Sequence, residues 1–212
     1  MQSYGEYACL QSSIHDCFAR LHSSTLETRL GYSPRDAFYT FPFPLDISSL
    51  ANIGREHHEF RGQLLQKRKV GITKLYNQFH DSKISDEEIQ VLRELHVKND
   101  VSVVAAYGWS DIMLDHGFHD VANLPVSDRT RFTISEDARI EVLRRLSDLN
   151  RQRYQEEVAA GLHESQALSK KPKAVKRQAV LSKVTTSQQQ AGFDFVAVSV
   201  HLEKLDYDKT KH

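Results

Sequence analysis

A short segment near the N-terminus limits the folds open to this chain. The stretch FYTFPFP holds four aromatic residues and two prolines within seven positions. Proline lacks a backbone N–H and fixes φ, so Pro42 and Pro44 exclude a helix interior or a central strand. The aromatic residues are Phe38, Tyr39, Phe41 and Phe43. We expect them to pack at a junction between two folded regions, because a surface loop would expose all four.

Helical patterns follow this junction. Apolar residues recur every three or four positions in three stretches, which predicts amphipathic helices. The first stretch runs from about Ile47 to His80, with Asp46 or Ser48 as its N-cap. A glycine costs about 1 kcal/mol relative to alanine inside a helix, so we expect a kink or break near Gly71.

The other two helices have clearer boundaries. One opens with a capping box, in which Ser85 bonds the first turn and Glu88 reciprocates, and it ends at Gly108. The last begins at Ser135 with acidic residues in its first turn and stops at Gly161.

The remaining N-terminal and central segments are less regular. A short helix is predicted from Ile14 to Leu21, with Ser12 or Ser13 as its N-cap. Residues 25–44 are expected to be extended and irregular, and residues 109–132 are rich in turn residues.

The C-terminal region has a different composition. Residues 164–191 are rich in Lys, Ser and Gln, which is typical of a flexible linker. Alternating apolar residues from Phe193 to Val200 predict one strand. A single strand is not stable alone, so this one must join a sheet from the N-terminal segment, another copy or a partner.

These patterns predict a mainly α protein. We expect a helical bundle with a small irregular or β portion at the N-terminus and one C-terminal strand. The predicted divisions are residues 1–45, which end in the junction, a helical domain at 46–163, a basic linker at 164–191, and a strand and tail at 192–212.

Charge is distributed unevenly along the chain. The 28 basic and 28 acidic side chains cancel, but the stretch between Glu164 and Asp194 has six basic residues and no acidic one. This asymmetry predicts a basic tail on an acidic body. Such a tail either contacts nucleic-acid phosphates or serves as a solvated linker, and both interpretations stay open.

Two features bear on the compartment. Cys9 and Cys17 are the only cysteines, which indicates a reducing environment without a disulfide framework. No apolar run approaches the roughly 20 residues that cross a bilayer, and the N-terminus lacks the pattern of a secretory signal. We therefore expect a cytoplasmic protein with no membrane partner.

Histidine-rich stretches invite a metal interpretation. His57 and His58 are adjacent, so they point about 100° apart on a helix and do not readily share an ion. His116 and His119 stand three apart between Asp115 and Asp120. No third well-spaced ligand accompanies them, so we expect a solvated turn and predict no metal site.

Other reactive residue types have structural explanations. Cys17 lies two positions from His15, a spacing that does not bring the two side chains together on a helix, so a buried structural thiol is expected. Trp109 follows the second long helix, and we expect it to close the core. The chain has no glycine-rich dinucleotide loop, phosphate loop or CxxC pair.

Several stretches, in order, are similar to one protein family. The run SSIHDCFARLHSSTLETRLGYSPRDAFYTFPFP resembles the end of the target-recognition region of single-chain bacterial restriction–modification adenine-N6 DNA methylases (type IIG/IIL-like). ITKLYNQFHD, VLRELHVKNDVSVVAAYGWSDI and EVLRRLSDLNRQRYQEEVAAGL resemble the helical region that follows it. The resemblance covers about residues 10–163, and it implies a hinge at Phe38–Pro44.

The chain also departs from that family. It lacks the glycine-rich S-adenosylmethionine motif, the NPPY-type tetrapeptide that grips a flipped adenine, and the nuclease carboxylates of some relatives. The resemblance therefore implies a C-terminal part with no catalytic residues and no cofactor of its own. S-adenosylmethionine is expected in an associated catalytic domain or chain.

The resemblance implies double-stranded DNA and a methyltransferase catalytic chain as partners. The candidate phosphate contacts are Arg29, Arg35, Lys170, Lys171, Lys173, Lys176 and Arg177. The alternative is a non-catalytic helical scaffold for protein–protein docking, in which the C-terminal strand pairs with a partner's sheet edge.

Overall fold

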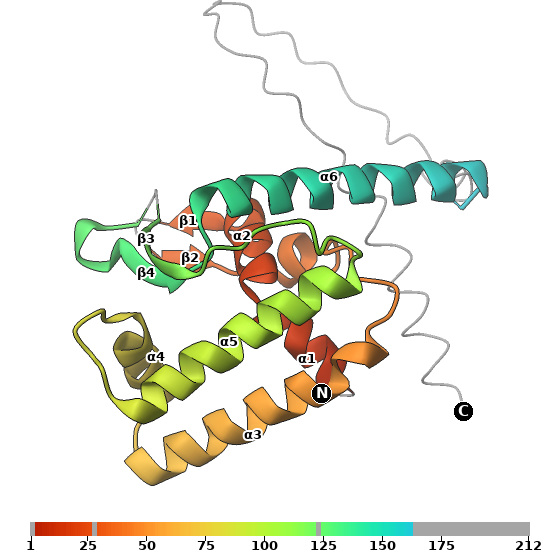
Figure 1. Ribbon diagram of the computed structural model, residues 1–212. Helices are drawn as coiled ribbons and strands as arrows, with labels where there is room; N and C mark the ends of the chain where they lie inside the picture. The colour runs from red at the N-terminus through yellow and green to blue at the C-terminus, as the bar shows by residue number, and fades with distance from the viewer. Residues whose placement is uncertain (1–2, 27–28, 122–123, 163–212) are drawn as a thin grey trace, which may run out of the picture. The chain divides into compact units, whose positions relative to one another are not determined.

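The computed structural model describes residues 3–26, 29–121 and 124–162 and shows a mainly α protein, as predicted (Figure 1). The chain divides into two compact units, Met1–Leu149 and Asn150–His212. The predicted basic linker and C-terminal strand lie outside the described residues. Within the described part, no helix combines the length and the apolar character needed to cross a bilayer.

The chain begins with a helix that its sequence pattern does not reveal. α1 (Tyr4–Gln11) starts after Ser3, whose Oγ accepts a hydrogen bond from the Glu6 N–H at 3.1 Å. The buried residues of α1 are Gly5, Tyr7, Ala8 and Cys9. Because these residues surround the helix axis, no apolar stripe marks the helix in the sequence.

α2 (Ser13–His22) is the short helix that the sequence predicts. Ser12 is its N-cap, and its Oγ accepts from the backbone N–H of His15 at 3.2 Å, which confirms one of the two expected caps. After α2, β1 (Ser24–Leu26) and β2 (Arg29–Gly31) pair as a short antiparallel hairpin.

The aromatic–proline segment is packed, not exposed. Phe41 is 2 % exposed, and its ring centroid lies 5.3 Å from that of Phe18 on α2. Pro42 and Pro44 are also buried. The expected small β portion at the N-terminus is confirmed by the hairpin, whereas the expectation of extended and irregular structure over residues 25–44 is wrong for a π-helical turn at Pro34–Phe38. The role of the segment as a junction stays a prediction.

The long helix expected from Ile47 to His80 is two helices. After a 3₁₀ turn at Ser48–Leu50, α3 runs over Ala51–Arg68 and α4 over Ile72–His80. Lys69, with φ of 50°, ends α3 in the left-handed region, so the predicted break near Gly71 is confirmed.

α5 (Glu87–Ala106) lies beside α3 (Figure 1). Its cap is Asp86, whose carboxylate accepts from the N–H groups of Glu88 and Ile89 at 3.1 and 3.2 Å. The predicted capping box on Ser85 is wrong by one residue, because the Asp86 side chain takes the free N–H groups of the first turn. The predicted end at Gly108, with φ of 76°, is confirmed.

The turn-rich region after α5 contains a hairpin that was not expected. β3 (Gly117–Asp120) pairs antiparallel with β4 (Thr130–Thr133), and Phe118 lies opposite Phe132. The strands are only four residues long and polar in part, so their sequence gives little alternation to detect.

α6 (Glu136–Ala159) is the last described helix, and its residues from Asn150 on belong to the second unit. The Oγ of Ser135 accepts from the Ala138 N–H at 3.3 Å, which confirms the predicted start. Gly161, with φ of 72°, follows its end as expected.

Two apolar clusters fill the first unit. One joins α1, α2 and α5 to the start of α6 through residues such as Phe18, Leu50, Val103 and Val142. The other lies between α3, α4 and α5 and is centred on Leu75, Phe79 and Leu92. Three residues of this second cluster, Tyr76, Phe79 and Phe132, also line the cavity of the candidate site.

Candidate functional site

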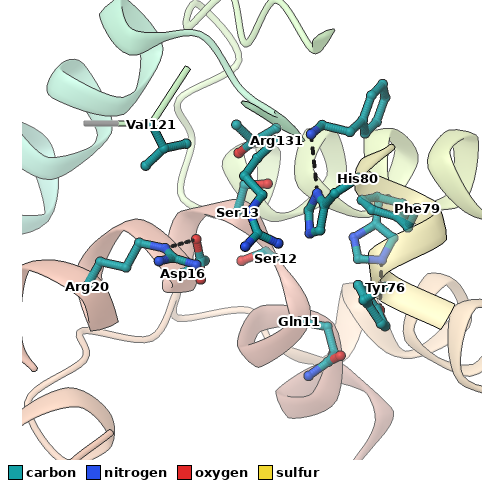
Figure 2. Close-up of a pocket in the computed structure, with 13 residues that line it drawn as sticks. Gln11, Ser12, Ser13, Asp16, Arg20, Tyr76, Phe79, His80, Val121 and Arg131 are labelled. Carbon is teal, nitrogen blue, oxygen red and sulfur yellow. Dashed lines mark hydrogen bonds and ion pairs between the residues drawn. The ribbon is translucent and has the colours of Figure 1, made fainter. Parts of the chain in front are cut away.

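A cavity of about 180 Å³ lies in the first unit, among the start of α2, the end of α4, the middle of α5 and strand β4. It is open to solvent and polar in part. Its ionisable or hydroxylic lining side chains include Ser13, Asp16, Arg20, His80, His96 and Arg131. Figure 2 shows Ser13, His80 and Arg131 around one space, with the Asp16–Arg20 pair beside it.

His80, the last residue of α4, has a defined hydrogen-bonding direction. Its Nδ1 accepts from the backbone N–H of Phe132 at 3.2 Å. Because a backbone N–H only donates, Nδ1 is unprotonated and Nε2 carries the proton of the neutral ring. Burial, together with the positive charges of Arg131, Arg20 and Arg93, lowers the pKa of His80 to about 3. His80 is therefore a neutral donor at pH 7.

Two tyrosine–histidine hydrogen bonds, joined by a ring contact between the histidines, extend from the cavity into the protein. The Tyr76 hydroxyl bonds Nε2 of His96 at 3.0 Å, and the His96 and His57 ring centroids are 4.4 Å apart. The Tyr7 hydroxyl then bonds Nδ1 of His57 at 2.8 Å. Burial lowers the pKa of His57 to about 4 and that of His96 well below its ordinary value. These rings are neutral and link α1, α3, α4 and α5.

Arg93 holds the end of α4 in place. Its side chain is 4 % exposed, and the guanidinium donates to the carbonyl oxygens of Phe79, Ile84, Gln78 and Asp81 at 2.9 to 3.3 Å. The carbonyls of Gln78 and Phe79 lie in the last turn of α4, where a helix leaves carbonyl oxygens without an intrahelical partner, and those of Asp81 and Ile84 lie in the segment that follows. Arg93 therefore positions His80 at the cavity without facing it.

Two arginines bring positive charge to the cavity. Arg20 donates from Nε to Asp16 at 2.7 Å, which leaves its terminal nitrogens without a hydrogen bond in the described part of the chain. Arg131 donates from Nε to the carbonyl oxygen of Asp128 at 2.9 Å, and its nearest carboxylate oxygen, also on Asp128, lies 3.9 Å away. The Arg131 side chain is only 24 % exposed.

Of the predicted DNA contacts, the structure places one side chain. Arg35 is exposed in the helical turn before the aromatic segment, and it makes no ion pair with the described residues. Arg29 lies in β2, and its side chain is not described. The other five candidates (Lys170, Lys171, Lys173, Lys176 and Arg177) lie outside the described residues.

The histidine and cysteine motifs have structural roles. His116 donates to Asp100 at 2.9 Å and His119 to the Asp115 carbonyl at 2.8 Å, so the two bind different partners. Among residues 3–26, 29–121 and 124–162, no group of three His, Cys, Asp or Glu side chains is arranged to hold a metal ion. Cys17 is buried, and burial raises its pKa, so it is the structural thiol that we expected.

Trp109 contributes to the core rather than to an exposed stacking surface. Its ring stacks on Tyr107 with centroids 4.3 Å apart and an interplanar angle of 11°. Both residues pack against the larger apolar cluster. The expectation that Trp109 closes the core is confirmed.

The arginines of α6 that lie in the first unit are neutralised by carboxylates. Arg139 pairs with Glu136, Arg144 with Glu141 and Asp148, and Arg145 with Asp111 and Glu141. This face is a network of local ion pairs, so it offers less free positive charge than its composition indicates.

The cavity residues were not identified from the sequence. Arg20, His80 and Arg131 lie 51 to 111 positions apart and in no motif. No spacing rule connects them, because tertiary packing alone brings them together. Comparison of this chain with protein families, with characterised proteins and with solved structures gives no match.

Proposed function

We propose that this chain is a DNA-recognition and accessory C-terminal part of a site-specific adenine-N6 DNA methyltransferase of a restriction–modification system. The observation that carries the proposal is the ordered series of stretches, from residue 10 to residue 163, that resemble that family. S-adenosylmethionine and the methyl transfer belong, in this proposal, to an associated catalytic domain or chain.

The structural roles of two residues in these stretches support the proposal. Asn99 and Asp100, in the stretch HVKNDVSVVAAYGW, are almost fully buried. The Asn99 amide donates to the carbonyl oxygen of Ala8 at 2.9 Å, and Asp100 accepts from the Ser13 N–H at 2.8 Å and from His116. Two residues of a stretch that resembles the family therefore join α5 to α1 and α2, and in this proposal they hold the helical scaffold together.

Binding to DNA is assigned to the exposed Arg35, to Arg29 and to the basic residues 170–177. Each phosphate contact releases counterions, so log K falls with log salt by about 0.9 per contact. Five contacts from the basic tail predict an affinity loss of several hundred-fold between about 50 and 200 mM salt.

The test compares the full chain with a variant in which Lys170, Lys171, Lys173, Lys176 and Arg177 are all changed to Gln. Fluorescence anisotropy with a labelled duplex measures the salt slope of each protein. We expect the slope of log K against log salt to be shallower by about four to five in the variant than in the wild type. Arg144→Gln is the control, because Arg144 is already paired with two carboxylates.

An unchanged slope, or wild-type affinity that does not respond to salt, contradicts the proposal. If the tail variant keeps its DNA affinity but loses a co-purifying protein chain, the docking alternative is supported instead. Methyl transfer by the purified chain alone would also contradict the assignment of chemistry to a separate partner.

A further inference from the structure

The cavity between α2, α4 and β4 contains more hydrogen-bond donors than the protein uses. The terminal nitrogens of Arg131 make no hydrogen bond to the described residues, although only 24 % of its side chain is exposed. A guanidinium has five donors, and leaving them unused in a partly buried position costs free energy. Apart from the ion pair with Asp128 at 3.9 Å, the terminal nitrogens of Arg131 are therefore available to an acceptor in the cavity.

Other donors face the same space from different elements. His80 Nε2–H, on α4, is a donor because Nδ1 accepts from the Phe132 backbone. Arg20, on α2, has free terminal nitrogens beyond its bond to Asp16. The hydroxyl of Ser13 also lines the cavity and makes no hydrogen bond to the described residues. These donors come from three elements and line one cavity, so an acceptor with several oxygen atoms can be reached from more than one side.

The fixed charges around the cavity favour an anion. Arg20 and Arg131 are cationic, Asp16 is the one carboxylate in the described lining, and His80 and His96 are neutral. The lining residues therefore carry more positive than negative charge, and Asp128, which is outside the lining, forms an ion pair with Arg131 at 3.9 Å. Asp120 and Glu136 line a smaller adjacent cavity, where Asp120 accepts from Thr130 and Glu136 pairs with Arg139.

We propose that this cavity binds a phosphate group, which Arg131, Arg20 and His80 hold together. Arginine matches phosphate with two parallel hydrogen bonds, and a neutral Nε2–H adds a donor from a second direction. The volume of about 180 Å³ far exceeds the roughly 10–15 Å³ that one water needs, so a polyatomic anion fits. The inference does not depend on the proposed DNA function.

The first experiment titrates inorganic phosphate into the full chain at constant ionic strength and follows binding by calorimetry. We expect saturable binding that Arg131→Gln weakens about ten-fold, the effect of losing a charge-assisted hydrogen bond. Arg129→Gln is the matched control, because Arg129 is exposed, lies two residues away and does not line the cavity. It should keep the wild-type affinity within about two-fold.

A second variant changes affinity in the opposite direction. Asp16→Asn removes the one carboxylate of the lining and frees Arg20, so phosphate should bind a few-fold more tightly. The Asp16 side chain is 51 % exposed, so the protein tolerates this change. Circular dichroism checks that each variant keeps the helical fold.

The proposal is overturned if phosphate does not saturate the protein, if Arg131→Gln binds as the wild type does, or if Asp16→Asn does not strengthen binding. A parallel titration with duplex DNA identifies the source of the phosphate. Weaker duplex binding by Arg131→Gln assigns the cavity to a backbone phosphate. Unchanged duplex binding, with phosphate binding lost, assigns it to a free phosphate compound. If the basic-tail variant shows that the proposed DNA function is wrong, the phosphate titration can still show whether the cavity binds phosphate.

Discussion

The hydroxyl of Tyr7 and Nδ1 of His57 lie 2.8 Å apart, and this bond joins α1 to α3 inside the protein. His57 is fully buried, and its Nε2 has no hydrogen-bond partner among the described residues. Protonating this ring would place an unpaired charge between two helices. The pair makes the fold sensitive to acid.

We predict that stability falls as the pH drops below about 6.5, the pKa of histidine in an unfolded chain. The folded protein keeps His57 neutral down to about pH 4 and His80 to about pH 3. Between pH 6.5 and the folded-state pKa of each ring, only the unfolded state takes up the proton. Each ring therefore lowers the free energy of unfolding by about 1.4 kcal/mol for every unit by which the pH falls. The stabilisation is fully present above pH 6.5.

Urea denaturation at pH 7, 6 and 5 measures this dependence. His57→Phe removes one titrating group, so its stability should fall less steeply with acid than that of the wild type. Equal slopes for both proteins would show that His57 is not the source of the acid sensitivity.

Gly54 of α3 lies against the backbone of α1, and we predict that Gly54→Ala is strongly destabilising. A Cβ at this position would overlap the backbone carbonyl of Tyr4. Backbone cannot move aside as a flexible side chain can, so we expect a loss of about 2–3 kcal/mol in the free energy of unfolding. Thermal or urea unfolding is the measurement.

Gly62, in the same helix, is the matched control. Nothing lies within 4 Å of a Cβ built at this position. Gly62→Ala should therefore stabilise the protein by about 0.5–1 kcal/mol, because alanine favours helix. If Gly54→Ala and Gly62→Ala change the free energy of unfolding in the same direction, the close contact of α1 with α3 is wrong.

Removing the Arg93 guanidinium should loosen the end of α4. Arg93→Met removes the four hydrogen bonds that the guanidinium donates to carbonyl oxygens, and a hydrogen bond to a charged group contributes about 1.5–3 kcal/mol. Methionine keeps much of the side-chain packing, so we expect a net loss of about 3 kcal/mol. Hydrogen exchange should show the loss first at residues 78–84.

Arg144→Met provides the comparison for Arg93→Met, since Arg144 forms only exposed ion pairs. It should change stability by less than about 1 kcal/mol. A similar loss in the two variants would contradict the structural role of Arg93.

Both cysteines should resist modification in the folded protein. Cys9 and Cys17 are buried, and burial raises the pKa of Cys9 to about 12 and that of Cys17 further. The thiolate is the reactive form, so a thiol reagent at about pH 8 should label neither residue until the chain unfolds. Rapid labelling of the native protein would contradict the burial of these helices.

Local signals in the sequence determined much of the helical framework. Ser12 and Ser135 cap helices as predicted, and Gly71 and Gly108 mark a break and an end. Caps, glycines and apolar spacing act within one or two turns, so they are legible without knowing the rest of the fold. The error at Ser85 shows the limit, since two neighbouring residues can both cap.

The tertiary structure alone decided the features that depend on distant contacts. α1 is helical without an apolar stripe because it is buried on several sides, and β3 pairs with β4 although nine residues separate the two strands in sequence. The cavity has the same origin: Arg20, His80 and Arg131 meet only after α2, α4 and β4 have packed. Local propensity carries no information on such encounters, because burial and long-range packing set them.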